Sequence, residues 1–285
     1  RILDRGYRRF EGHRSGTVGA VRSVAWHTTR SILGLGRKAR HKIVPVAVIL
    51  IAFLPAVIWV GVTALLPVDV LGDELRPEYW ELFETSIFPV LLFAALVAPE
   101  ALVRDRRDGM LALYLSSPLT RGTYLLSKIV AVLGTMSIII IGPPLLTLVG
   151  YTFEGQGPDG PLEWFDVLGR ISLAGVIIVA VYAAVAGAAS SITDRRAFAS
   201  VSVILVLLGA AIVTRILVEE DVVGHNLLVL DPVGLPLELS ARVFGDRGDA
   251  PDRDVATSLV VAGCAGWITA GGSVIWNRYR RLAAV

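Results

Sequence analysis

The chain has 285 residues, of which 54% are hydrophobic and 18% are charged, and its formal net charge is +2 at pH 7. A soluble domain contains about 45–50% apolar residues, and the mean hydropathy of +0.65 is high for such a protein. The apolar residues also form uninterrupted blocks that are longer than a soluble core requires. The composition therefore excludes an ordinary soluble protein and indicates a chain that crosses a membrane.

Six apolar segments are long enough to span a bilayer, whose core of about 30 Å needs about 20 helical residues. Five blocks of 18 to 24 residues carry no charge, and a sixth, 85–99, is long enough if Glu84 and Glu100 lie at the interfaces. We therefore predict an all-α membrane protein with six transmembrane helices. The expected spans are approximately 43–66, 85–103, 123–150, 168–192, 197–217 and 255–277, between an N-terminal segment 1–42 and a tail 278–285.

The distribution of arginine and lysine predicts the orientation of these spans. Cytoplasmic segments of membrane proteins carry an excess of both residues. If the N-terminus is cytoplasmic, 21 of the 27 basic residues fall in the cytoplasmic segments. Those segments are 1–42, 100–128, 194–196 and 278–281. We therefore expect both termini to be cytoplasmic.

Residues 17–35 are predicted to form an amphipathic helix that lies on the inner leaflet. The apolar residues that recur at helical spacing are Val18, Val21, Val24, Ala25, Ile32 and Leu35. Arg22, His27 and Arg30 occupy other faces, and Trp26 suits an interface between lipid and water. A solvated helix without membrane contact is the alternative.

The chain lacks the usual signatures of catalytic and metal sites. Cys264 is the single cysteine, the four histidines show no metal spacing, and no nucleotide-binding G-x-x-x-x-G-K-[ST] loop occurs. The apolar interiors of the spans contain no charged residue or histidine, which disfavours proton-coupled transport and intramembrane proteolysis. We expect no catalytic, cofactor or metal site in this chain, and no nucleic-acid partner.

Proline and small residues indicate spans that bend and pack closely. Each proline removes a backbone donor and tends to kink its helix. The prolines in the spans are Pro45, Pro55, Pro89, Pro99, Pro143 and Pro144. The fourth span contains AAVAGAASS at 183–191, whose small side chains allow another helix to approach closely.

The segment 104–128 is unusual for a connection between two apolar spans. Its sequence is RDRRDGMLALYLSSPLTRGTYLLSK, with five basic residues, two acidic residues and one proline. We expect the second span to continue into the cytoplasm as a helix through 104–115. The apolar contacts that this helix would offer are Leu111, Leu113 and Leu115.

A turn is predicted after this helix, near 116–120. Pro118 cannot easily continue a helix, and it pushes the residue before it away from helical geometry. Thr120 is a candidate N-cap for the third span. A leucine-bearing helix flanked by arginines favours a docking element for a soluble partner over a solvated connector.

Four stretches of the chain resemble ABC-2 type exporter permeases. Residues 103–128 resemble the family pattern R-E-R-x-x-G-T-L-E-x-L-L-x-S-P-[VL]-[ST]-R-x-x-Y-[LI]-x-[GS]-K, with Met110 and Ala112 in place of the usual threonine and glutamate. The N-terminal stretch LDRGYRRFEGHR resembles the opening of one branch of the family. Similar too are the short basic turn SSITDRRAFAS and the outer-loop stretch LDPVGLPLELSARVFGD.

The resemblance implies a half-transporter with the architecture of type V exporters, in a bacterial plasma membrane. Two permeases, identical or homologous, would pair within the membrane lipids, and each would bind a separate ATPase subunit in the cytoplasm. ATP and Mg²⁺ would bind to the ATPases, whose closure would push on a coupling helix between the second and third spans. The outer loop 219–254 would contain short helices, near 227–244, that dip partway into the membrane.

The residues implicated in coupling to the ATPase surround the connection between the second and third spans. They are Glu100, Arg104, Arg106, Arg107, Asp108, Gly109, Leu113, Pro118, Thr120 and Arg121. The spacing of Glu100 and Arg104 permits an i,i+4 ion pair that would brace the helix, with a surface pair of little consequence as the alternative. Arg106 and Arg107 are expected at or beyond the inner interface, open to the partner.

Two other classes of function remain as alternatives to an exporter permease. A polytopic membrane enzyme is weakened by the absence of charged groups from the span interiors. A channel or scaffold subunit is weakened by the docking element. The uncharged span interiors mildly favour lipidic or amphipathic cargo over small ions.

Overall fold

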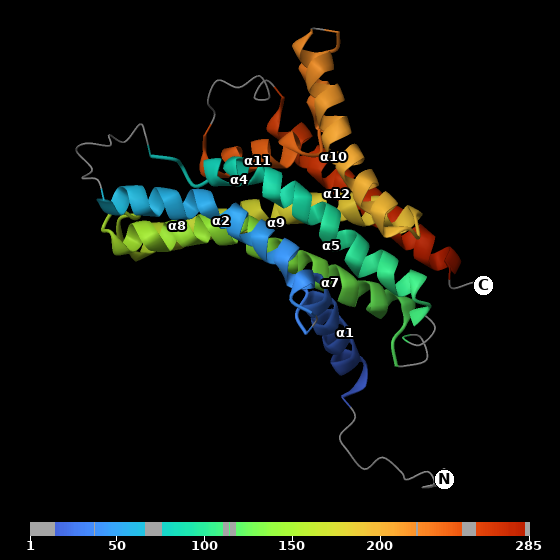
Figure 1. Ribbon diagram of the computed structural model, residues 1–285. Helices are drawn as coiled ribbons and strands as arrows, with labels where there is room; N and C mark the ends of the chain where they lie inside the picture. The colour runs from blue at the N-terminus through green and yellow to red at the C-terminus, as the bar shows by residue number, and fades with distance from the viewer. Residues whose placement is uncertain are drawn as a thin grey trace, which may run out of the picture.

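The computed structural model describes residues 15–36, 38–65, 76–110, 114, 118–220, 222–246 and 255–282. All regular elements in these residues are helices, which confirms the predicted all-α class (Figure 1). Their bounds are α1 Gly16–Ile32, α2 Arg40–Leu65, α4 Glu81–Thr85, α5 Ile87–Arg107, α7 Arg121–Ile140, α8 Gly142–Phe153, α9 Gly160–Ile192, α10 Arg196–Glu219, η2 His225–Leu230, α11 Gly234–Phe244 and α12 Thr257–Leu282.

Six of these helices, within the described residues, are long and apolar enough to cross a membrane, as predicted. The qualifying stretches are Lys42–Leu65, Ile87–Arg107, Arg121–Ile140, Gly160–Ile192, Arg196–Glu219 and Thr257–Arg281. α9 is much longer than the roughly 20 residues that a bilayer requires, so part of it extends beyond the apolar core.

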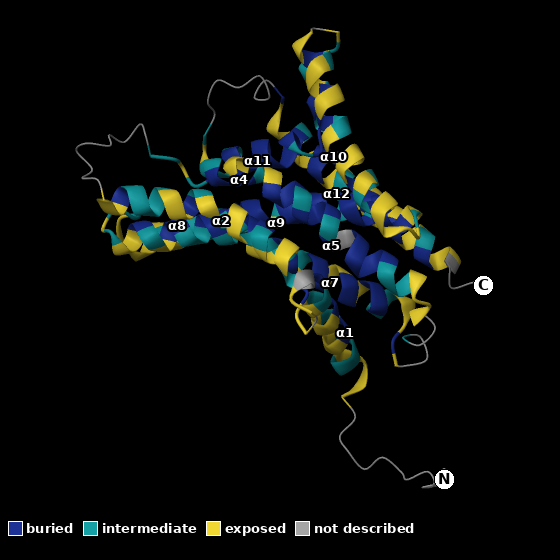
Figure 2. Cartoon of the chain, viewed as in Figure 1, coloured by how far each residue is buried: buried dark blue, intermediate teal, exposed yellow. Residues whose placement is uncertain are grey.

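α5 lies at the centre of the bundle and α2 at its edge. In the most apolar stretch of each helix, 71% of the α5 residues are buried, against 17% for α2 and 28% for α10. α5 packs against α2, α7, α9 and α10, and also touches α1. In Figure 2 the α5 and α9 ribbons are mostly dark blue, whereas α2 and α10 carry long exposed stretches. α5 and α9 therefore form the interior of the bundle: α5 contacts α1, α2, α7 and α10, and α9 contacts α7, α10, α11 and α12.

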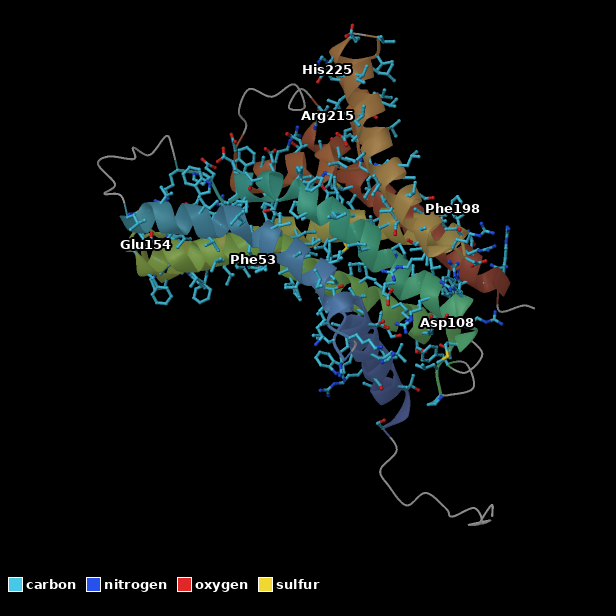
Figure 3. All side chains as sticks on the ribbon, in the orientation of Figure 1. Phe53, Asp108, Glu154, Phe198, Arg215 and His225 are labelled. Carbon is cyan, nitrogen blue, oxygen red and sulfur yellow. The ribbon has the colours of Figure 1, made fainter. Side chains whose placement is uncertain are left out.

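Five helix ends meet at one end of the bundle. α5, α9 and α12 finish there and α7 and α10 begin there, on the right of Figure 1. Figure 3 places Asp108 and Phe198, from the end of α5 and the start of α10, at this same end. It carries residues 104–107, 194–196 and 278–281, and we call it the basic end.

The third span is broken into two helices at its prolines. α7 finishes at Ile140 and α8 starts at Gly142, with Pro143 and Pro144 in the first turn of α8. Proline has no N–H to donate and tolerates only the first turn of a helix. The helix is interrupted at this site, whereas Pro45 and Pro55 are accommodated within the continuous helix α2 and Pro99 within α5.

The chain before the last span forms two short helices, η2 and α11, of which α11 packs inside the bundle. The residues of α11 from Gly234 to Ala241 are buried against α9 and α12. The Tyr182 hydroxyl donates to the carbonyl oxygen of Val233 at 3.0 Å. Tyr182 precedes the end of α9 at Ile192 by ten residues, or about 15 Å of helix. The turn between η2 and α11 therefore lies deep along α9, as a segment that dips into a membrane would.

One sequence prediction, the continuous helix through 104–115, is wrong. α5 finishes at Arg107, and Gly109 adopts the left-handed backbone conformation with φ of 66°. Glycine reaches this conformation without the steric cost that a Cβ imposes, and it commonly terminates helices. Leu111, Leu113 and Leu115 lie outside the described residues, as does the N-terminal stretch LDRGYRRFEGHR.

The small residues of the fourth span allow α9 and α12 to touch backbone to backbone. A Cβ added to Gly271 of α12 would lie 2.6 Å from the carbonyl oxygen of Ala184 in α9. Gly187 lies against Ile275 and Leu102 in the same region. The expectation of close helix approach at 183–191 is therefore confirmed.

This contact predicts a difference between two neighbouring glycines. Gly271→Ala should lower the free energy of unfolding by about 1–3 kcal/mol, because the backbone of Ala184 cannot move aside easily. Gly272→Ala is the matched control, since a Cβ there meets nothing within 4 Å. Thermal unfolding of both variants in detergent is the measurement. Equal midpoints for the two variants would contradict the close approach.

Candidate functional site

The last turns of α5 carry three charged side chains that are drawn into the protein at the basic end. Glu100 is buried, and the side chains of Asp105 and Arg106 are 13% and 5% exposed. Each of the three points to a different group of neighbouring helices, as their contacts show. We call these three residues and their partners the α5 hub.

Glu100 connects α5 to α1 and α10. Its Oε1 accepts hydrogen bonds from Ser31 Oγ at 3.1 Å and from Arg104 Nη1 at 3.1 Å. Its Oε2 is 3.0 Å from Arg196 Nη1 at the start of α10. Arg104 also donates to Ser31 Oγ at 2.7 Å. The predicted pair of Glu100 and Arg104 is confirmed, and it belongs to a partly buried contact of three helices in which Glu100 is the buried member.

Asp105 connects α5 to α7 and, through Lys128, to α1. Lys128 Nζ lies 2.6 Å from Asp105 Oδ2 and donates to Thr28 Oγ1 of α1 at 2.9 Å. The Tyr124 hydroxyl donates to the same Asp105 oxygen at 3.0 Å. Burial raises the pKa of Tyr114, which lies beside this pair, and the charge of Asp105 raises it further. The Tyr114 phenol is therefore neutral at physiological pH.

Arg106 connects α5 to the end of α9. Its Nη2 donates to the carbonyl oxygens of Ser190 at 2.8 Å and Thr193 at 2.7 Å, and its Nη1 donates to that of Ser191. The last carbonyls of a helix have no partner within the helix, and they carry partial negative charge that a guanidinium stabilises. The expectation that Arg106 is open to a partner is wrong, because its side chain is occupied by these carbonyls.

The remaining implicated residues lie on the exposed turn that follows α5. Arg107, the last residue of α5, and Asp108 and Gly109, which follow it, are exposed. Pro118, Thr120 and Arg121 are exposed where α7 begins. We call residues 107–110 and 118–121 the exposed turn. Leu113, the apolar member of the set, lies outside the described residues.

Thr120 caps α7 as the sequence predicts. Its backbone is extended, its Oγ1 accepts from the Thr123 N–H at 3.3 Å, and Thr123 Oγ1 accepts from the Thr120 N–H at 2.8 Å. This reciprocal capping box satisfies two donors that a helix start leaves unpaired. The exposed turn therefore has a fixed boundary at α7.

Sequence reasoning missed the partners of the α5 hub. Nothing in the sequence pattern pairs Lys128 with Asp105, and Ser31 and Thr28 were not considered. The only indication of the α1 partners in the sequence is that Thr28 and Ser31 are polar residues near the apolar positions Val24 and Ile32.

The α5 hub joins neighbouring helices through paired charges and hydrogen bonds. No group of three or more His, Cys, Asp or Glu side chains among the described residues could hold a metal ion. Buried ions are tolerated only when their charges are paired and their remaining hydrogen-bonding atoms are satisfied. These contacts attach the end of α5 to α1, α7, α9 and α10.

Removal of either of the two adjacent arginines at the end of α5 should change the free energy of unfolding by different amounts. Arg106→Ala leaves three helix-end carbonyls without their donor and should lower the free energy of unfolding by about 2–4 kcal/mol. Arg107→Ala removes an exposed side chain and should change it by less than about 0.5 kcal/mol. The reaction of buried Cys264 with a thiol-reactive dye during heating would report unfolding. Equal loss in the two variants would contradict the assignment of Arg106.

The pair of Asp105 and Lys128 should show strong coupling in a double-mutant cycle. Either Asp105→Asn or Lys128→Met leaves an uncompensated buried charge, which costs about 3–5 kcal/mol. The double variant removes both charges and should recover a large part of that loss. Additive effects in urea-dependent or thermal unfolding would show that the two side chains do not interact.

A known protein family matches most of the chain. A family model described as ABC-2 family transporter protein matches residues 26–230. The matched range runs from within α1 to the end of η2, so it includes five of the six spans and the whole α5 hub. No curated protein sequence matches the chain.

Proposed function

The chain belongs to the ABC-2 family of transporter proteins, and from this membership we propose that it is the permease subunit of an ATP-driven exporter. In this proposal it forms the pathway across the membrane and does not hydrolyse ATP itself. The observation that carries the proposal is the family match over 26–230, combined with six membrane-crossing helices.

We propose that two permease chains, identical or homologous, form the working unit with two separate ATPase subunits. The outward faces of α2 and α10 support this pairing, since they leave large apolar side chains uncovered. These side chains include Leu50, Leu54, Val57, Val201, Leu205 and Ile212. In the proposal part of this surface contacts the second permease and part contacts lipid. ATP and Mg²⁺ would be held by the ATPase subunits.

The basic end is proposed to face the cytoplasm of a bacterial cell. It collects the ends of five helices, and most of the arginine and lysine residues near spans belong to it. This distribution supports the orientation, because positive residues flank spans on the cytoplasmic side. The ATPase subunits would then meet the exposed turn, which extends from the same end.

The route for mechanical coupling runs from the exposed turn through α5. A force on the turn acts first on Arg107 and Asp108, which directly continue α5. Glu100, Asp105 and Arg106 would transmit that displacement to the ends of α1, α7, α9 and α10, to which they are bonded. Because α5 is the most buried span, it cannot move without its neighbours.

The proposed composition is tested by isolating the complex. An ATPase with a nucleotide-binding loop, encoded in a neighbouring reading frame, should co-purify with this chain when the two are expressed together. ATP hydrolysis should require the lysine of that loop in the ATPase and no residue of this chain. Hydrolysis by the purified chain alone, traced to it by substitution, would overturn the proposal.

The exposed turn is tested by reversing its charge without disturbing the α5 hub. Arg107→Glu/Arg121→Glu should fold normally but bind the ATPase at least about tenfold more weakly. The new carboxylates would face an acidic surface on the ATPase, and like charges at an interface can cost several kcal/mol. Arg280→Glu/Arg281→Glu makes the same change elsewhere at the basic end and should bind the ATPase normally. If the two variants bind and transport equally, the exposed turn does not receive the ATPase.

A further inference from the structure

A basic cavity lies at the basic end, between the end of α5 and the start of α10. Its volume is about 700 Å³. The residues that line it are Arg107, Asp194, Arg195, Arg196, Ala197 and Ser200. They belong to the end of α5, the turn after α9 and the first turns of α10, and none of them is apolar apart from Ala197.

The charges around the basic cavity are not balanced. Asp194 is 3.6 Å from Arg106, and Arg196 is 3.0 Å from Glu100, so these two lining residues already have partners of opposite charge. Arg107 and Arg195 form no ion pair with any of the described residues. The cavity therefore presents two guanidinium groups without a counter-ion from the described part of the chain.

The start of α10 adds to the attraction for an anion. Arg195 occupies the N-cap position, and its side chain does not cap the helix. The first backbone N–H groups of α10 therefore lack a side-chain acceptor at the edge of the cavity. An unfilled helix start carries partial positive charge and favours an anion.

An exposed apolar stripe begins one turn beyond these arginines. Phe198, Val201 and Leu205 follow one another on a single face of α10, and their side chains are 60%, 60% and 66% exposed. The Arg195 guanidinium lies 5.8 Å from the centre of the Phe198 ring, so the cationic and apolar surfaces are continuous. Figure 3 shows Phe198 projecting from the outer side of α10.

We propose that the basic cavity and this stripe bind one anionic phospholipid from the leaflet around the basic end. Its phosphate lies between Arg107 and Arg195, and an acyl chain lies along Phe198, Val201 and Leu205. Basic pockets between membrane helices select anionic headgroups in this way. A soluble anion would satisfy the arginines but would leave the adjacent apolar stripe unused, so the combination favours a lipid. The proposal requires only that the chain is in a membrane and does not depend on its transport activity.

Lipid selectivity at this position can be measured with a fluorophore on Val201→Cys, in a Cys264→Ser background. The full chain is reconstituted into phosphatidylcholine bilayers that contain brominated phosphatidylglycerol or, for comparison, brominated phosphatidylcholine. Bromine quenches only a fluorophore that the lipid touches. Quenching at Val201 should give an association constant about tenfold or more higher for phosphatidylglycerol, since each basic residue contributes roughly fivefold.

The matched variants separate this site from general attraction to negative lipid. Arg107→Ala/Arg195→Ala should reduce the preference to within about twofold of unity, whereas Arg280→Ala/Arg281→Ala at the same end should retain it. A fluorophore on Leu162→Cys, an exposed position at the start of α9 and at the other end of the bundle, should report no preference.

Three results would overturn the proposal. Equal association of the two lipids at Val201 would show that the arginines do not select a headgroup. No quenching by either lipid would show that a second copy of the chain or another protein covers this face of α10. Loss of the preference in millimolar inorganic phosphate, but not in sodium chloride of equal ionic strength, would assign the cavity to a soluble anion.

Discussion

A charge that enters an apolar bundle must be paired, and this constraint determines the arrangement of the basic end. The desolvation of an unpaired ion costs several kcal/mol even after the protein relaxes. Glu100, Asp105 and Arg106 enter the bundle on α5, and their partners come from α1, α7, α9 and α10. The positions of these four helices relative to α5 are therefore fixed by electrostatics as well as by apolar packing.

The position of α1 is the clearest consequence of this constraint. Its sequence is that of an amphipathic helix, with exposed Arg22, His27 and Arg30 on its polar side. Its buried face, however, includes Thr28 and lies against α7 and α5, where Thr28 and Ser31 bond to Lys128 and Glu100. Contact with the inner leaflet stays a prediction for the rest of its surface, where Trp26 is exposed. The helix is attached to the bundle by hydrogen bonds that an interface helix does not need.

Periodic and local features could be predicted from the sequence, but the pairings of charged side chains between helices could not. The six spans could be predicted from uncharged runs of residues. The Thr120 cap could be predicted from the residue type that precedes a helix, and the break in the third span from two adjacent prolines. The end of α5 was misplaced because Gly109 lies within an otherwise helical pattern, and a single glycine does not always stop a helix. Arg106 and Arg107 are indistinguishable in sequence, yet one is buried and one is exposed, because only Arg106 faces the end of α9.

If the α5 hub holds α1 and the other helix ends as one body, loss of one hub charge should loosen them together, and hydrogen exchange of the full chain measures this. Amide exchange would be compared between the wild-type chain and Lys128→Met in the same detergent or nanodisc. In Lys128→Met, α1, the end of α5 and the start of α7 should lose protection together, while α11 and the first half of α12 should not. Unchanged protection of α1, with faster exchange only next to residue 128, would contradict the account.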